Sequence, residues 1–281
     1  MIIVDFSQIA LASILVNPKY HYDIDNVRYI ILNSIRNINS KFRNDYGEMV
    51  LAIDSGNSWR KEVYPYYKAN RKKSREVSSL DWNAMFNILH TIREEIAENF
   101  PYKVITSPRA EADDIIATLV KTFSGDDKIL IVSGDKDFQQ LQKYPNVEQW
   151  DHQNKKMTKC DMPGAFLIEH IIRGDTSDGV PNILSNDDVF VVPGSRQSRM
   201  TSGKFQKFFE DAMRGKMPED EKTRRNYIRN NMTINLDNVP EHMTDAILET
   251  FNNYVVPEKS KMLPYFIKNK LSKLMTNLND F

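Results

Sequence analysis

Three apolar, β-type runs in the first half of the chain each end in an aspartate. The runs Ile2–Val4, Leu51–Ile53 and Ile129–Val132 are followed by Asp5, by Asp54, and by Asp135 and Asp137. Between these runs lie segments with apolar residues at helical spacing, namely Asp25–Asn44, Asp81–Asn99 and Ala110–Phe123. Strands that alternate with helices predict an α/β fold, with a central, mostly parallel sheet and helices on both sides.

The character of the sequence changes after about residue 160. Shorter β runs at Val104–Ile105 and Val147–Trp150, and a helical segment at Lys136–Lys143, complete the first part. Beyond them helical patterns dominate, and the polar, Gly- and Pro-punctuated segment Ser185–Ser202 predicts a loop. We therefore expect an α/β core over residues 1–160 and a smaller helical region, packed against the core, over residues 161–281.

Several classes of protein are disfavoured by composition. No apolar run approaches the roughly 20 residues that span a bilayer. Met1–Asp5 carries a charge at once, which indicates a strand and not a signal peptide. The only cysteine, Cys160, excludes an internal disulfide and fits a reducing cytoplasm. The histidines show no pair at zinc-ligand spacing, so no structural zinc site is expected; they are His21, His90, His152, His170 and His242.

The net charge of zero hides a local concentration of basic residues. The chain has 38 basic and 38 acidic residues, whereas general nucleic-acid binders are usually basic. Between Arg60 and Arg75, however, seven basic residues stand against a single acid, Glu62. A contact with nucleic acid is therefore expected at one segment and not over the whole surface.

The aspartates that follow the strands should meet at one edge of the sheet. Ligands of an open parallel sheet bind beyond the carboxyl ends of its strands, where the run Glu111–Asp114 also begins a helix. Up to seven carboxylates there would repel one another unless cations lay among them. Such hard oxygen ligands suit Mg²⁺ or Mn²⁺, and two ions roughly 4 Å apart commonly cleave phosphodiesters.

Each acidic group also has a simpler interpretation. An aspartate after a strand is often a turn residue or a helix N-cap, which applies to Asp5 and to the pair Asp135 and Asp137. The run Glu111–Asp114 complements a helix dipole. The coincidence of several acidic strand ends favours the metal site over these separate interpretations.

Five motifs together resemble the flap endonuclease/5′-nuclease family. They are Val4-Asp5-Phe6-Ser7, Ala52-Ile53-Asp54-Ser55, Glu111-Ala112-Asp113-Asp114-Ile115-Ile116-Ala117, Ser133-Gly134-Asp135-Lys136-Asp137-Phe138 and Gly174-Asp175-Thr176-Ser177-Asp178-Gly179-Val180-Pro181. Each motif alone is moderately specific, but all five occur in the order and spacing of the family. The likeness spans essentially the whole chain, so the implied fold is the PIN/5′-nuclease-like α/β fold.

The resemblance implies two Mg²⁺ ions, for which Mn²⁺ would substitute. Residues that match the family's first metal site are Asp5, Asp54, Glu111, Asp113 and Asp135. Residues that match its second site are Asp137, Asp175 and Asp178, with Asp114 near either ion through water. The two acids of the Gly174–Pro181 motif have an alternative interpretation as turn or cap residues.

The basic segment between Trp59 and Ser79 is similar to the family's flexible helical arch over the active site. Its Tyr67–Arg71 stretch resembles a Tyr-Lys-x-Asn-Arg signature, which implies that Lys68 and Arg71 act on the scissile phosphate. Implied contacts to nucleic acid are Arg60, Lys61, Tyr67, Lys68, Arg71 and Lys72, with Tyr64, Tyr66 and Tyr67 as stacking platforms. Pro65 should interrupt any continuous helix, so ordering on DNA is expected. The alternative is a solvated basic loop.

Gly174–Pro181 also resembles the start of the family's helix–turn–helix-like element, which grips duplex DNA and often holds K⁺. The usual Gly-x-Gly-x-Lys continuation is missing here, which leaves the K⁺ site open. Lys204 and Lys207 are the candidate phosphate contacts in this region.

The implied activity is a Mg²⁺-dependent 5′-3′ exonuclease and flap endonuclease with RNase H activity. Its partners would be DNA duplexes with 5′ flaps or nicks and RNA–DNA hybrids, in primer removal and flap trimming. A monomer is expected, and residues 259–281 could dock on a replication protein such as a single-stranded-DNA-binding protein or pack on the core. Two rivals remain: a catalytically silent junction-binding protein, and a phosphatase, although Asp5-Phe6-Ser7 lacks the Asp-x-Asp of Asp-nucleophile phosphatases.

Overall fold

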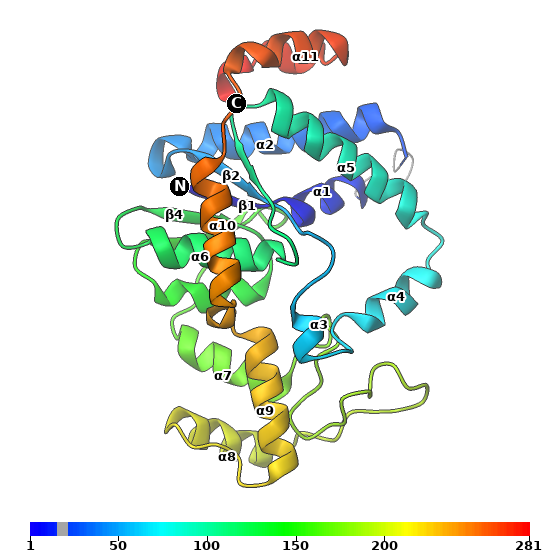
Figure 1. Ribbon diagram of the computed structural model, residues 1–281, viewed down its shortest axis with the longest axis vertical. Helices are drawn as coiled ribbons and strands as arrows, with labels where there is room; N and C mark the ends of the chain where they lie inside the picture. The colour runs from blue at the N-terminus through cyan, green and yellow to red at the C-terminus, as the bar shows by residue number, and fades with distance from the viewer. Residues whose placement is uncertain (16–21) are drawn as a thin grey trace.

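The computed structural model describes residues 1–15 and 22–281, and His21 lies outside the described residues. Its centre is a six-stranded sheet with the order β3-β2-β1-β4-β5-β6 (Figure 1). The strands are β1 (Ile2–Asp5), β2 (Met49–Ala52), β3 (Lys103–Ile105), β4 (Ile129–Val132), β5 (Val147–Asp151) and β6 (Lys156–Thr158). All neighbours are parallel except β5 and β6, which confirms the predicted mostly parallel α/β sheet.

Helices connect the strands and form the second half of the chain. The α-helices are α1 (Phe6–Leu15), α2 (Ile24–Tyr46), α3 (Arg60–Val63), α4 (Ala69–Glu76), α5 (Trp82–Asn99), α6 (Ala112–Phe123), α7 (Pro163–Arg173), α8 (Ser202–Met213), α9 (Glu221–Ile234), α10 (Glu241–Asn253), α11 (Met262–Lys268) and α12 (Ser272–Met275). The 3₁₀ helices that follow the sheet's strands or the later α-helices are η2 (Lys136–Lys143), η3 (Leu236–Asn238), η4 (Lys259–Lys261) and η5 (Leu278–Asp280). Residues 185–201 form neither helix nor strand, as predicted.

The two faces of the sheet bury separate apolar clusters. Side chains alternate along β1, so Ile2 and Val4 pack with α1, α2 and α5 on one face, whereas Ile3 packs with α6 and α10 on the other. Helices α11 and α12 close the first cluster, through Met262 and Leu274 among others. Strands buried on both faces explain why these runs are continuously apolar and not alternating.

Among the described elements of residues 1–160, α1 and β6 were not predicted. Helix α1 follows β1 directly, with the Asp5 carboxylate accepting from the Gln8 amide as a cap 3.1 Å away. Its apolar residues are spread around the helix, so its sequence lacks a clear amphipathic stripe. Strand β6 is three residues long and pairs antiparallel at the edge, too short for a sequence pattern. The segment Lys136–Lys143 is helical as predicted, but as a 3₁₀ helix.

The carboxyl ends of β1, β2 and β4 lie side by side. In the sheet register Val4 neighbours Leu51 on one side and Val132 on the other. The residues that follow these strands therefore emerge at the same edge. Helices α3, α4, α7 and α9 lie beyond this edge, in the lower part of Figure 1. None of the helices that the structure describes has the length and apolar character needed to cross a membrane.

Candidate active site

The first acidic group surrounds the ends of β1, β2 and β4. The Asp54 carboxylate accepts from the amide of Ala112 at 2.9 Å, and Asp135 accepts from the amide of Asp137 at 2.9 Å. The capping interpretation is therefore correct as local geometry for Asp135, whereas the bond of Asp54 reaches the start of α6. A capping bond uses one carboxylate oxygen, so it does not exclude a second role for the other oxygen.

The acids of this group raise one another's pKa values, as expected of carboxylates that lie close together. Burial raises the pKa of Asp5 to about 7, and the charges of Asp54 and Asp135 add to that rise. Burial also raises the pKa of Asp113 well above its ordinary value, and although Lys68 opposes the rise, Asp135 and Glu111 increase it. Such shifts mean that the chain alone does not neutralise these carboxylates.

Glu111 differs because cations of the chain surround it. It is the N-cap of α6, and Lys68 Nζ lies 2.5 Å from one of its oxygens. Arg60 Nη1 at 3.0 Å, Ser58 Oγ at 2.8 Å and Tyr67 OH at 3.1 Å donate to the other oxygen. Burial would raise its pKa, but Lys68 and Arg60 outweigh burial and lower the pKa to about 2. Glu111 is therefore ionised and held in a fixed position.

Asp114 lies behind this group in a buried ion pair with Arg60. Arg60 Nη2 is 2.8 Å from one Asp114 oxygen, and Trp59 Nε1 donates to the other oxygen at 3.2 Å. Only 1% of the Arg60 surface is exposed, and its Nε donates to the carbonyl of Thr233 at 2.8 Å. The expected nucleic-acid contact of Arg60 is corrected by this geometry: the side chain joins α3, α6 and α9 inside the protein.

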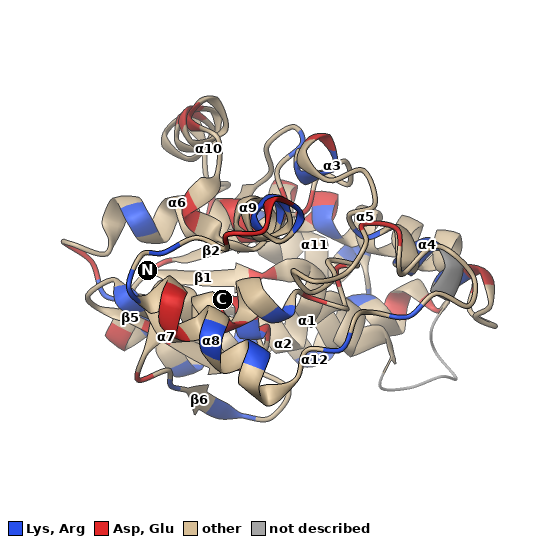
Figure 2. Cartoon of the chain, turned by 90° about the horizontal axis from the view of Figure 1, so that it is seen from below, with Lys and Arg blue, Asp and Glu red and all other residues tan. Residues whose placement is uncertain are grey.

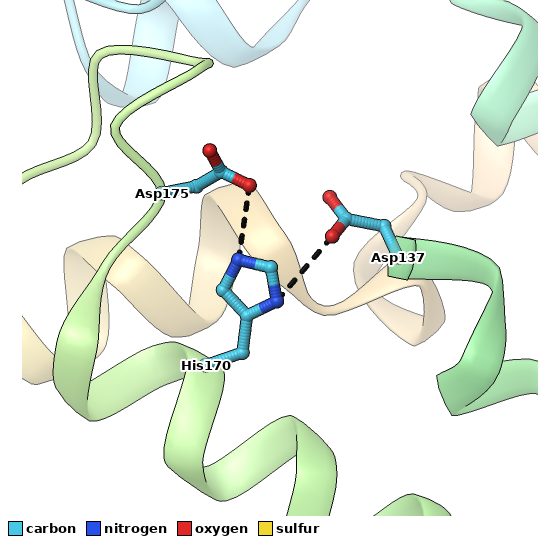
Figure 3. Close-up of side chains that lie close together, drawn as sticks. All are labelled: Asp137, His170 and Asp175. Carbon is cyan, nitrogen blue, oxygen red and sulfur yellow. Dashed lines mark hydrogen bonds and ion pairs between the residues drawn. The ribbon is translucent and has the colours of Figure 1, made fainter. Parts of the chain in front are cut away.

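The second acidic group contains a histidine that was not predicted. His170 on α7 lies between Asp137 and Asp175 (Figure 3). Its Nε2 is 3.0 Å from Asp175 Oδ2, and its Nδ1 is 3.3 Å from Asp137 Oδ1. Within residues 1–15 and 22–281, these three side chains form the group whose possible metal-ligand atoms all lie within 4.8 Å of one another. Asp175 also contacts Lys136 Nζ at 3.3 Å.

The charges of this second group are unequal. Burial raises the pKa of Asp137 to about 7, where His170 opposes the rise and Asp135 increases it. Burial acts in the same direction on Asp175, but hydrogen bonds from His170 and Ser177 outweigh it and lower its pKa. Asp137 Oδ1 is buried and has no hydrogen-bond partner in the described chain. Asp137 is therefore the incompletely paired acid of the group.

The basic segment between Trp59 and Ser79, here called the arch segment, contacts Asp178 and Glu111. Tyr67 OH donates to Asp178 at 2.8 Å, Arg71 Nη2 lies 2.5 Å from Asp178 and Lys68 Nζ lies 3.6 Å from it. Lys68 precedes α4 with a φ of 57°, and it nevertheless points to the same acid as Arg71. Burial disfavours the charge of Lys68, but Asp178 and Glu111 outweigh burial and raise its pKa. Both cations are therefore charged at the edge of the sheet.

The aromatic residues of the segment differ in exposure. Tyr64 and Tyr67 are 1% and 2% exposed, whereas 39% of Tyr66 is exposed. Tyr64 OH donates to the carbonyl of Gly179 at 3.0 Å. The expectation that Tyr64 and Tyr67 stack on bases is therefore corrected, because both rings are enclosed by the protein. The interruption of the helix around Pro65 is confirmed, since α3 and α4 are separate.

Helix α9 supports the loop that carries Asp175 and Asp178. Asn226 Nδ2 donates to the carbonyls of Ile183 and Ser185 at 2.9 and 2.8 Å. Asn230 Nδ2 donates to the carbonyls of Ile171 and Pro181 at 2.8 and 2.9 Å. Both amides are fully buried, so a polar face of α9 fixes the backbone next to the acids.

Exposed basic residues lie at the same end of the molecule. Lys61 and Lys72 belong to the arch segment, and Lys204 and Lys207 belong to α8. Figure 2 shows basic positions along α3, α8 and α9 on the face viewed from below. These side chains are available to an anionic partner, whereas Arg60 and Tyr67 are not.

Two family models match the chain. One, described as 5′-3′ exonuclease, N-terminal resolvase-like domain, matches residues 19–166. The other, described as T4 RNase H, C terminal, matches residues 163–281. Their boundary lies close to the predicted change of character at residue 160.

Named relatives agree with these models. Ribonuclease H of Enterobacteria phage T4 is 37% identical over 289 aligned residues, which cover 99% of this chain and 95% of that protein. Flap endonuclease Xni of Shewanella sp. (strain MR-4) is 40% identical over 135 residues, which cover 45% of this chain and 48% of that protein.

Solved structures show the same fold at low sequence identity. The T5 D15 protein co-crystallised with metal ions superposes with a TM-score of 0.62 at 17% identity, over 89% of this chain and 98% of that one. The T5 D15 flap endonuclease in a pseudo-enzyme-product complex with DNA and metal ions gives a TM-score of 0.63 at 17% identity, over 90% and 99% of the two chains.

Proposed function

Because the chain belongs to the 5′-3′ exonuclease/flap endonuclease family, we propose that it hydrolyses phosphodiesters near the 5′ end of RNA or DNA annealed to a DNA strand. The observation that carries this proposal is the meeting of two acidic groups with Lys68 and Arg71 at one sheet edge. Acids alone would suit many hydrolases. Acids beside fixed cations suit a reaction at an anionic phosphate.

The carboxylates of the two acidic groups are suited to bind divalent cations. The buried Asp137 Oδ1 has no hydrogen-bond donor among the described residues, and the pKa values of Asp5 and Asp137 are raised to about 7. The carboxylates of the site outnumber the chain's own cations beside them. Mg²⁺ binds such oxygen ligands, and Mn²⁺ would substitute for it. The proposed first site comprises Asp5, Asp54, Glu111, Asp113 and Asp135. The proposed second site comprises Asp137, Asp175 and Asp178.

Bound Mg²⁺ would activate the attacking water and stabilise negative charge on the phosphate in the transition state. The chain's own part is to place its cations. Lys68 Nζ contacts Glu111 and Asp178, one acid from each proposed site, so it lies beside both. Arg71 pairs with Asp178 and also donates from its Nε to the carbonyl of Ser177 at 3.2 Å. We assign to these two side chains the stabilisation of charge on the scissile phosphate.

Asp114 and Arg60 act through other residues. Both Asp114 oxygens are engaged by Arg60, Trp59 and the amide of Glu111. We propose that the pair positions Glu111 and does not contact substrate. K⁺ binding by the Gly174–Pro181 element, which the missing Gly-x-Gly-x-Lys continuation leaves open, forms no part of the proposal.

We assign duplex binding to the helical region over residues 161–281, as distinct from the nuclease core over residues 1–160. Lys204 and Lys207 are exposed on α8 and free to approach a phosphate backbone. The role inferred is primer removal and flap trimming in replication. A replication protein such as a single-stranded-DNA-binding protein stays a predicted partner, and so does the monomeric state.

Digestion of end-labelled substrates tests the proposal. Flap, nicked and RNA–DNA hybrid duplexes should be cut near the 5′ end with Mg²⁺ and stay intact with EDTA. Tight binding of these duplexes without cleavage in Mg²⁺ or Mn²⁺ would replace the nuclease by a junction-binding protein. Hydrolysis of a small phosphoester, with no cleavage of nucleic acid, would favour a phosphatase.

A further inference from the structure

The second acidic group contains one atom type that the oxygen-rich first group lacks, an imidazole nitrogen. We propose that His170 Nδ1 is a direct ligand of the second cation together with Asp137. Asp175, which we assigned to that site above, then serves it by orienting the imidazole and not as a direct ligand. This inference rests on the proposed function, because it assigns chemistry to one of its two cation sites.

The two ring nitrogens of His170 have different surroundings. Nε2 forms a hydrogen bond with Asp175 Oδ2 at 3.0 Å. Nδ1 lies 3.3 Å from Asp137 Oδ1, but that oxygen is buried without a hydrogen-bond partner among the described residues. With the proton on Nε2, Nδ1 presents a lone pair toward an oxygen that also presents lone pairs. Two facing acceptors require a shared cation or a proton.

The separation of these atoms fits a shared metal ion. Adjacent ligands of an octahedral ion with bonds of about 2.1 Å lie roughly 3.0 Å apart. Nδ1 and Asp137 Oδ1 are 3.3 Å apart. A small displacement would therefore place both atoms on one cation, and Figure 3 shows the ring edge turned toward Asp137.

Asp175 is committed to other contacts. Its Oδ1 accepts from the amide and the hydroxyl of Ser177, at 2.7 and 2.6 Å. Its Oδ2 faces His170 Nε2, with Lys136 Nζ 3.3 Å away. A metal-bound histidine usually donates its other N–H to a carboxylate, which fixes its tautomer and orientation. Asp175 occupies that orienting position here.

A nitrogen ligand changes which ions the second site prefers. Imidazole favours first-row transition metals over Mg²⁺, which binds oxygen almost exclusively. The second site should therefore bind Mn²⁺ more tightly than an all-carboxylate site would, and discriminate more strongly against Mg²⁺. His170 is buried on α7, so its position does not depend on a surface loop.

Pulsed electron paramagnetic resonance of the Mn²⁺-loaded full chain tests the ligand directly. The wild-type protein should show hyperfine coupling from a directly bound ¹⁴N. Labelling with ¹⁵N-histidine should replace that coupling with one from ¹⁵N. The coupling should disappear in His170→Gln and persist in His90→Gln, whose histidine is exposed on α5. Asp175→Asn should retain the coupling, because Asp175 only orients the ring and His170 still supplies the nitrogen that binds Mn²⁺.

Calorimetric titration supplies the second measurement. His170→Gln should weaken Mn²⁺ binding at one site by at least about 10-fold, because loss of even an outer-shell partner typically costs about 10- to 100-fold, and should weaken Mg²⁺ binding by a smaller factor. If His170→Gln does not fold, the ¹⁵N-labelled wild-type protein still decides. Absence of nitrogen coupling in the wild type would overturn the proposal, even if Mg²⁺-dependent cleavage is intact. Nitrogen coupling without cleavage of any substrate would instead overturn the proposed function.

Discussion

The carboxylates at the sheet edge and the carboxylate of Glu95 are all at least partly buried, but they differ in how far the chain's own side chains neutralise them. Glu95 on α5 accepts from Arg28 Nε at 2.7 Å and from Tyr265 OH at 2.7 Å. Burial would raise its pKa, but these partners outweigh burial and lower it. Asp5 and Asp137 instead have pKa values raised to about 7.

The contrast separates an acid that stabilises the fold from acids that are kept for binding. Glu95 joins α2, α5 and α11 through side chains of the chain itself. The acids at the edge have fewer cations of their own than negative charges, and their closeness costs stability until cations bind. Substitutions in the two regions should therefore have opposite consequences for stability and activity.

Asp135→Asn should have the largest effect. One lost ligand removes several kcal/mol of transition-state stabilisation, so cleavage should fall by about a hundredfold or more. Fold and duplex binding should persist, because the amide can still accept from the Asp137 amide. Single-turnover cleavage and circular dichroism measure both, with the exposed Asp126→Asn as a matched control. Near-native turnover would remove Asp135 from the metal set.

Lys68→Ala should lower the single-turnover rate by about a hundredfold at saturating enzyme, because charge builds up where Lys68 acts. Lys204→Ala should instead weaken binding and reduce its salt dependence by about one unit of slope. Cleavage and binding of both variants can be measured on one flap substrate. Full recovery of the Lys68→Ala rate at saturation would make the arch an electrostatic tether and not a catalytic element.

Divalent cations should stabilise the folded protein through the edge acids. Binding of Mg²⁺ to the native state at a hundred times its Kd adds about 2.7 kcal/mol, which corresponds to a rise in Tm of roughly 5 to 10 °C. EDTA should reverse the rise, and Asp135→Asn should reduce it. A Tm that is indifferent to millimolar Mg²⁺ at matched ionic strength would show that the acids do not share cations.

Glu95→Gln should lower the free energy of unfolding by about 2 kcal/mol near neutral pH, because hydrogen bonds to a charged group are lost. The folded-state pKa of Glu95 is lowered, so its contribution is present above the unfolded value of about 4.3 and is lost as pH falls through the folded value. The difference in the free energy of unfolding between Glu95→Gln and the wild type should therefore shrink in acid. Urea unfolding at neutral and acidic pH measures it, and cleavage at neutral pH should be unaffected. A difference that is independent of pH would assign the effect to packing.

The fold was predictable because the buried strands and their terminal acids are adjacent in sequence. Asp5 ends its strand, Asp54 and Asp135 follow theirs after one or two intervening residues, and parallel pairing brings all three to one edge. The burial of Arg60 was not predictable, since its partner carbonyl at Thr233 lies 173 residues away. An arginine in a basic run resembles a phosphate contact until that distant partner is known.

The histidine was missed for a related reason. His170 lies five residues before Asp175, but its other neighbour, Asp137, lies on a different element that follows β4. Its position four residues before Gly174, near the C-terminal end of α7, was the available signal. Zinc-ligand spacing considers only pairs of histidines and cysteines, so a single histidine among distant acids was not recognised.

The polar face of α9 restricts how this region can vary among related chains. An apolar residue at Asn226 or Asn230 would leave the buried carbonyls of Ile183 and Ile171 without their donors. Carbonyls near the end of the same helix accept from Arg60 and Gln140. We therefore expect sequence drift in α9 to be confined to its exposed side.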